Sequence, residues 1–125
     1  MKLKALSELE QEVMNVVWEI NTCSVRAVLK RISKKKNLAY TTIATILQRL
    51  YEKGLVVRNN KDFVVHYSPK VSKEAYVKSI AGSFFTTFFQ SFGDTAIASF
   101  AESIVELSKE KKDYFLKLLE KSNET

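Results

Sequence analysis

Cysteine, proline and glycine are all scarce in this chain of 125 residues, which contains one, one and three of them. A single cysteine excludes a disulfide within the chain and any metal site built from several thiolates, and it is typical of a reducing compartment. So few glycines and prolines leave long, rarely broken elements, which predicts a mainly helical fold. Hydrophobic residues make up 46% and charged residues 27%, as in average globular domains, so disorder is not expected.

Long apolar runs are also missing. The N-terminal sequence MKLKALSELE becomes acidic where a secretory signal needs an apolar segment, so we expect a cytoplasmic protein. Residues 79–101 carry only one charged side chain, Asp94, but hydroxyl and amide side chains interrupt them throughout. They are too polar for a transmembrane helix, and no membrane partner is expected.

Residue sets for catalysis are absent as well. No acid–base pair, glycine-rich phosphate loop or metal-ligand spacing occurs in the sequence. We expect Cys23 to pack as a small apolar residue and His66 to be structural. The sequence therefore predicts a protein that is not an enzyme and that has no cofactor and no metal site.

Negative charge is scarce in the N-terminal part of the chain. Residues 1–70 contain 13 Lys or Arg and 6 Asp or Glu, whereas residues 71–125 contain 7 and 8. A basic part joined to a near-neutral part suits a module that binds a polyanion and a second module that binds a partner. On charge alone, a generally basic globular protein is the alternative.

Residues 1–70 predict three helices. The first follows a capping box formed by Ser7 and Glu10, and the second follows the N-cap residue Ser24. The third ends near Gly54, where a left-handed residue would terminate it. From the helical spacing of apolar residues, the three helices are expected at about residues 8–20, 25–33 and 40–53.

The hydrophobic pattern then changes from helical to alternating. Residues 55–58 and 63–67 are β-branched and aromatic runs, and the polar residues 59–62 between them predict the turn of a β-hairpin that ends at Ser68-Pro69. Three helices followed by a hairpin are typical of a winged helix-turn-helix domain. The predicted fold class is mainly α with a small β-hairpin wing, and the winged domain is expected to span residues 1–70.

Residues 71–125 predict three more helices, which carry an aromatic stripe. Ser72, Asp94 and Ser108 are placed to begin them. The winged domain already has its own core, so this stripe would stay exposed unless a second copy of the chain covered it. A monomer that buries these aromatic residues in its own core is the alternative. We expect a C-terminal helical dimerisation domain whose interface contains Phe84, Phe85, Phe88, Phe89, Phe92, Phe100 and Leu118.

A family resemblance is carried by residues 39–56, AYTTIATILQRLYEKGLV, which resemble the recognition-helix signature of the penicillinase-repressor (BlaI/MecI/CopY-like) family. Trp18 and the strand end Tyr67-Ser68-Pro69 also resemble family features. The resemblance is specific over residues 5–70 and rests on helix pattern alone beyond them. It implies a homodimeric transcriptional repressor that binds a palindromic operator in double-stranded DNA, with β-lactamase, resistance or cell-wall genes as targets.

Metal sensing is not expected from this resemblance. The copper-sensing branch of the family has a C-x-C…C-x-C tail, whereas this chain has no Cys after Cys23. Soft-metal sites need several thiolates, so copper or zinc sensing by that route is not expected.

The predicted third helix carries short side chains opposite its apolar stripe. Such a face enters the major groove and contacts thymine methyls and base edges. We expect base contacts from Thr41, Thr42, Ala44 and Thr45. Phosphate contacts, which give affinity without sequence information, are expected from Arg26, Lys30, Lys35, Arg49, Lys53, Arg58 and Lys61. An ordinary solvated helix face and solubilising surface charges are the alternatives.

The resemblance also implies how repression is relieved. Repressors of this family are cut just before a Phe in the dimerisation half, usually after Asn, which makes a sensor or protease a further partner. Ser99 and Phe100 occupy the matching position here, with Ser in place of Asn. The alternative is that Phe100 is simply a core residue.

Two other functions stay open from the sequence. One is an adaptor that binds protein through a winged-helix scaffold. The other is a structural protein that binds DNA without sequence preference.

Overall fold

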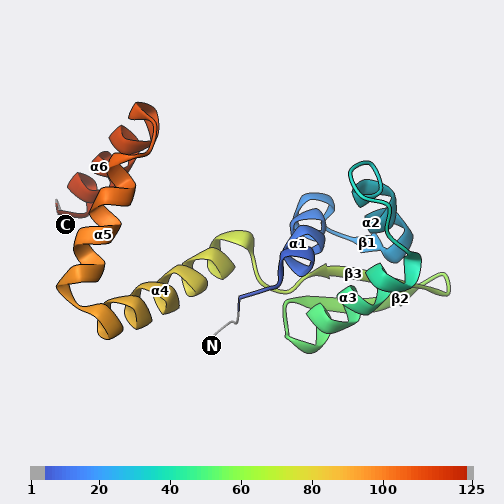
Figure 1. Cartoon of the computed structure of the whole chain (residues 1–125). Coiled ribbons are helices and arrows are strands. Elements are labelled where there is room, and N and C mark those ends of the chain that lie inside the picture. The colour runs from blue at the N-terminus through green and yellow to red at the C-terminus, as the bar shows by residue number, and fades with distance from the viewer. Residues whose placement is uncertain (1–4, 124–125) are drawn as a thin grey trace. The chain divides into compact units, whose positions relative to one another are not determined.

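The computed structural model describes residues 5–123 and divides into two compact units, one up to Ala81 and one from Gly82 onward (Figure 1). The division falls inside α4 (Lys73–Phe92), later than the boundary after residue 70 expected from the sequence. The reason is that Tyr76 is buried in the core of the first unit and Ile80 packs against that core.

The first unit contains the three helices and the hairpin of the winged-helix prediction, and its antiparallel sheet has three strands in the order β1-β3-β2 (Figure 1). Its elements are α1 (Glu8–Ile20), β1 (Cys23–Ser24), α2 (Val25–Ile32), α3 (Tyr40–Glu52), β2 (Val56–Lys61) and β3 (Val64–Pro69).

The predicted helix ends of the first unit are confirmed. Ser7 Oγ accepts a hydrogen bond from the Glu10 N–H, and Glu10 Oε1 accepts one from the Ser7 N–H at 2.9 Å, which completes the capping box of α1. Ser24 Oγ accepts from the Ala27 N–H at 3.1 Å and caps α2. After α3, Gly54 has a φ of 80°, which is the left-handed terminator expected there.

The hairpin prediction was right in kind and wrong in register. β2 continues through Asn59, Asn60 and Lys61, and the turn consists of Asp62 and Phe63. The second strand ends as predicted, because β3 stops at Pro69, which pairs with Val56. The polar side chains of residues 59–61 are tolerated within the strand because they are exposed there.

A third strand was not expected. β1 lies in the break between α1 and α2, where Cys23 pairs with Tyr67 and Ser24 pairs with His66 of β3. Two residues are too few for a periodicity signal, so only the fold reveals the pairing.

The core of the first unit collects the apolar faces of its helices and of the sheet. Val13, Met14 and Val17 of α1 meet Ile43, Leu47 and Leu50 of α3, and all six are fully buried. Trp18 fixes the chain that leaves the sheet, because its ring N–H donates to the Val71 carbonyl at 2.9 Å and its ring contacts Tyr76.

The second unit contains the end of α4 followed by α5 (Asp94–Val105) and α6 (Lys109–Asn123). Ser72 and Ser108 begin α4 and α6 as predicted, with hydroxyls that accept from the N–H groups of Ala75 and Lys111. The prediction for Asp94 was wrong. The N-cap is Gly93, with a φ of 57°, and Asp94 is instead the first residue of α5.

Aromatic rings connect the three helices of the second unit. Phe85 of α4 meets Phe100 of α5 edge to face at 5.0 Å between ring centroids, and Phe100 contacts Phe115 of α6 at 6.2 Å. Nevertheless, Ala96 is the one buried residue among those described after Ala81. The second unit therefore has apolar contacts but no closed core of its own.

No helix described between residues 5 and 123 is long and apolar enough to cross a membrane.

Candidate nucleic-acid interface

The exposed side of α3 carries the four residues predicted to contact bases. Thr41 and Thr45 are exposed, and Thr42 and Ala44 are half-buried beside them. Thr45 Oγ1 donates to the Thr41 carbonyl at 2.8 Å. Because this bond uses the hydroxyl proton, the methyl group and the accepting hydroxyl oxygen of Thr45 remain free.

The N-terminus of α3 is open to an anion. Its N-cap, Ala39, has no side-chain hydrogen bond to the first turn, whereas serines cap the two helices that precede it. The unpaired N–H groups of a helix N-terminus carry partial positive charge. Arg26 of α2 adds a full charge there, since its guanidinium lies 5.5 Å from the centre of the Tyr40 ring.

The C-terminal half of α3 holds a second arginine, which comes from the wing. The guanidinium of Arg58 on β2 lies over the Tyr51 ring at 4.1 Å, and its Nη1 donates to Gln48 Oε1. Stacking and hydrogen bonding together restrict this side chain before any ligand binds. The two tyrosines thus place predicted phosphate-binding arginines at opposite ends of α3.

Arg49 lies beside the predicted base-contact residues. With Thr41, Thr42 and Thr45, it lines an open hollow of about 360 Å³ between α3 and the start of α1. The structure therefore brings three of the four predicted base-contact residues together with one predicted phosphate contact.

The remaining predicted phosphate contacts differ in how free they are. Among residues 5–123, none of the ion pairs involves Lys30, Lys35 or Lys61, and all three side chains are exposed. Two neighbouring basic residues are already paired with α1, Arg31 with Glu19 and Lys36 with Glu12. The remaining predicted contacts that are outside ion pairs therefore lie at the end of α2 and just after it, where Lys30 and Lys35 stand, and on the wing, where Lys61 stands.

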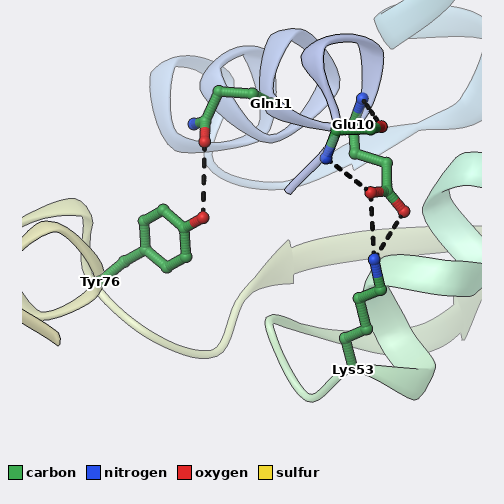
Figure 2. Close-up of polar contacts among 5 residues, drawn as sticks. Glu10, Gln11, Lys53 and Tyr76 are labelled. Atoms are coloured by element: carbon green, nitrogen blue, oxygen red, sulfur yellow. Dashed lines mark hydrogen bonds and ion pairs between the residues drawn. The ribbon is translucent and has the colours of Figure 1, made fainter. Parts of the chain in front are cut away.

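Lys53 has a structural partner. Its ammonium lies 3.0 and 2.9 Å from the two carboxylate oxygens of Glu10, as Figure 2 shows. Glu10 is only 7% exposed and also completes the capping box of α1. In the same view, the Tyr76 hydroxyl meets the side-chain oxygen of Gln11. Because its charge is neutralised within the fold, Lys53 is left out of the proposed phosphate contacts.

The Glu10–Lys53 pair predicts a specific pH dependence of stability. The hydrogen bond from Lys53 and the Ser7 N–H lower the pKa of Glu10 from 4.5 to about 2 against the opposing effect of burial. A folded-state pKa below the unfolded value stabilises the protein above about pH 4.5, and this contribution is lost as the pH falls toward about 2. Since water partly screens Lys53, we expect its size to be on the order of 2 kcal/mol.

Urea unfolding of Glu10→Gln measures this contribution. The variant should be less stable than the wild type at pH 7, by about that amount, and the two free energies of unfolding should converge near pH 2. A constant difference across this range would show that the loss comes from packing and not from the charge.

Cys23 and His66 take no part in the surface around α3. Cys23 is buried and free of disulfides, and burial raises the pKa of its thiol to about 11, so it packs as a neutral residue as predicted. The half-buried His66 ring contacts the Val64 carbonyl of its own strand. Within residues 5–123, no three His, Cys, Asp or Glu side chains gather as a metal site.

Sequence reasoning missed Tyr40 and Tyr51, the two aromatic residues that hold arginines. Both lie on the exposed side of α3, where an aromatic side chain is otherwise unexpected. That exposure is the signal that could have identified them. The pairing of Lys53 with Glu10 spans 43 positions of sequence and gives no local signal.

An exposed helix of short side chains, followed by a hairpin whose arginine bonds back to that helix, defines a winged helix-turn-helix protein. The chain belongs to the penicillinase repressor family, which matches residues 6–121 and is a family of transcriptional repressors, not enzymes. The Bacillus licheniformis penicillinase repressor is 29% identical over 119 residues, covering 95% of this chain and 92% of that one.

Two further relatives match to different extents. The methicillin resistance regulatory protein MecI of Staphylococcus aureus is 24% identical over 120 residues, covering 96% of this chain and 97% of the relative. The transcriptional regulator BlaI of Mycobacterium tuberculosis is 36% identical over 80 residues, covering 63% and 58%.

Two solved structures resemble the first unit. The DNA-binding domain of the repressor BlaI matches with a TM-score of 0.52 at 32% identity, covering 58% of this chain and 90% of that one. The monomeric form of Bacillus licheniformis BlaI in complex with the blaP half-operator matches with a TM-score of 0.50 at 32% identity, covering 58% and 89%.

Proposed function

We propose that this repressor binds a palindromic operator as a homodimer, with α3 in the major groove. The observation that carries the proposal is the α3 surface. It exposes Thr41 and Thr45 beside the half-buried Thr42 and Ala44, has an N-terminus without a side-chain cap, and is flanked at both ends by arginines that lie over tyrosine rings. Small side chains allow close approach to bases, and charged side chains at the edges bind the backbone. The complex of the relative BlaI with a half-operator supports the same mode of binding.

Affinity comes mainly from phosphate neutralisation in this proposal. The phosphate contacts are assigned to exposed basic residues on α2 and just after it, on α3 and on the wing, which are Arg26, Lys30, Lys35, Arg49, Arg58 and Lys61. Each neutralised phosphate releases condensed counterions, so the affinity should fall steeply as the salt concentration rises.

The second unit supplies the surface that binds the second copy of the chain. Phe84 is 58% exposed and Phe92 63% exposed on α4, and Tyr114, Leu116, Leu118 and Leu119 of α6 are exposed as well. A second copy is the natural cover, because a two-fold axis pairs the same apolar surface with itself and matches the symmetry of a palindromic operator. Phe85 and Phe100 already contact each other within one chain, so the interface is assigned to the exposed residues around them.

Binding to duplex DNA separates this function from its two alternatives. The full chain should retard a mixed-sequence duplex weakly and an operator fragment far more tightly, by at least about a thousandfold at physiological salt. An adaptor for proteins would retard neither duplex. A structural DNA-binding protein would bind both equally. We place the repressor in the cytoplasm and assign it β-lactamase, resistance or cell-wall genes, which competition between genomic fragments would test.

Relief of repression is assigned to cleavage between Ser99 and Phe100. Both residues lie in the middle of α5, and Phe100 packs against Phe85 and Phe115. A protease needs extended backbone, so α5 must first unwind locally. Cleavage would then remove α6 and its apolar side chains from the dimer, each contributing roughly 1.5–3 kcal/mol when buried.

Mass spectrometry of the protein from cells treated with a β-lactam tests this step. The expected product is a fragment that ends at Ser99, absent from untreated cells and accompanied by loss of operator binding. An intact chain released from DNA would contradict cleavage and require a ligand or another signal in its place.

A further inference from the structure

The turn of the wing holds an aromatic residue in an unusual backbone conformation. Lys61 pairs with Val64, so the loop between β2 and β3 contains only Asp62 and Phe63. Their φ angles are 53° and 65°, the pattern that a two-residue type I′ hairpin loop requires. Glycine and asparagine normally occupy such positions, and a bulky residue there is strained. Hairpin formation therefore does not explain the choice of Phe63.

Packing does not explain this residue either. The Phe63 side chain is fully exposed, more so than any other exposed large hydrophobic residue between residues 5 and 123. It adds nothing to the core, and the neighbouring Val64 and Val65 are far less exposed, at 46% and 38%. A large ring held in water by a strained turn is more typical of a contact residue than of a structural one.

The wing is tied to the surface that faces DNA in the proposed function. Arg58, on the same strand that leads to the turn, stacks on Tyr51 and donates to Gln48, and both partners belong to α3. The position of the hairpin is therefore fixed relative to α3. When α3 occupies the major groove, a wing held beside it lies next to the adjacent minor groove.

The chemistry of the tip favours an apolar contact there. Lys61 carries a positive charge and Asp62 a negative one, so the ring follows a locally neutral pair of side chains. Repulsion between Asp62 and phosphates disfavours a contact through the turn backbone. A ring that enters the groove reaches sugars and base edges, and apolar side chains of this kind open base steps that unstack easily.

We propose that Phe63 inserts its ring into the minor groove beside the α3 site and partly unstacks a base step. The inference rests on the DNA-binding function proposed above. It adds a specificity-determining residue that reads the deformability of a step instead of its base edges, so the operator should prefer a flexible pyrimidine–purine step under the wing.

The turn itself provides a sharp test, because Phe63→Gly should relieve strain while it removes the ring. We expect an unchanged or higher melting temperature together with about tenfold weaker binding to the duplex that the wild type enriches from a random pool. Phe63→Trp should keep most of the affinity. Asparagine also tolerates positive φ, so Phe63→Asn should behave like Phe63→Gly. If the glycine variant is less stable than the wild type, Phe63→Asn replaces it in the comparison.

Fluorescence of 2-aminopurine, placed in turn at adenines on either side of the α3 site, reports unstacking directly. Wild-type protein should raise the signal at one flanking step, and Phe63→Gly should not. Equal affinities, or equal fluorescence at every position, would overturn the role of Phe63 and leave the repressor function intact. Wild-type protein that binds no duplex would overturn both. If Phe63→Gly bound DNA as tightly as the wild type but no longer repressed in cells, Phe63 would contact a protein partner and not DNA.

Discussion

Thr45→Glu should abolish sequence-specific DNA binding and leave the fold intact. Thr45 is exposed on α3, and its hydroxyl proton is engaged by the Thr41 carbonyl, so its methyl group and the accepting hydroxyl oxygen remain for a base. A carboxylate there would be larger and would face phosphates and base acceptors. We expect operator affinity to fall more than about 100-fold, because a two-fold dimer presents the residue twice. Circular dichroism and melting should match the wild type, since exposed substitutions change stability little.

Thr45→Val is the matched control for this prediction. Valine keeps the methyl surface and loses only a hydroxyl whose proton already bonds within the helix, so its affinity should lie within a few-fold of the wild type. A severe loss in Thr45→Val would assign recognition to the hydroxyl. If Thr45→Glu kept full specific binding, the proposal that α3 lies in the major groove would be wrong.

Lys35 and its neighbour Lys36 test the assignment of phosphate contacts. Lys35 has no ion-pair partner among residues 5–123, whereas the neighbouring Lys36 is 3.0 Å from Glu12. Lys35→Ala should weaken binding to all sequences equally and reduce the salt slope by about one, and Lys36→Ala should do less. A change in the preferred sequence on loss of Lys35 would contradict its assignment to phosphate.

Phe84→Asp should convert the dimer into monomers. Phe84 is 58% exposed within one chain, and its ring contacts with Phe85 and Phe88 lie within α4, so the substitution leaves the ring contacts between helices of the second unit in place. In a two-fold interface it places two carboxylates on apolar surface and removes two rings, a loss of roughly 3–6 kcal/mol. Sedimentation should show monomers at concentrations where the wild type is dimeric. Operator affinity should fall by orders of magnitude because the two half-sites are no longer bound together.

Gln90→Asp is the control for the dimer. It introduces the same carboxylate at an exposed polar position of α4 and should leave the dimer unchanged. If Phe84→Asp stayed dimeric, the interface would lie on another surface. If it failed to fold, its loss of helical signal would separate that outcome from dissociation.

Locally encoded features of the fold followed from the sequence. The capping box of Ser7 and Glu10 and the terminator Gly54 act within a few residues, so side-chain chemistry and apolar spacing were sufficient to predict them. The order of helices and hairpin likewise identified the winged domain. The α3 surface was predictable because a helix buries one face and its sequence therefore reveals the other.

Features that depend on distant partners did not follow. The strand at Cys23 exists only because Tyr67 pairs with it, and Lys53 is removed from the phosphate contacts only because Glu10 lies beside it. The hairpin turn was misplaced because polar composition suggested it within residues 59–62, whereas strand pairing sets it at Asp62 and Phe63. Phe63 was consequently assigned to a strand, which concealed its exposure at the tip.

The central claim is that two copies of this chain place two α3 helices on a symmetric DNA site. Selection of bound sequences from a random duplex pool by the wild-type protein tests it most directly. The expected result is an enriched inverted repeat whose half-site centres lie one or more helical turns apart, about 10 base pairs for each turn. A pool that stays unenriched after repeated rounds, or an enriched site without two-fold symmetry, would contradict the account.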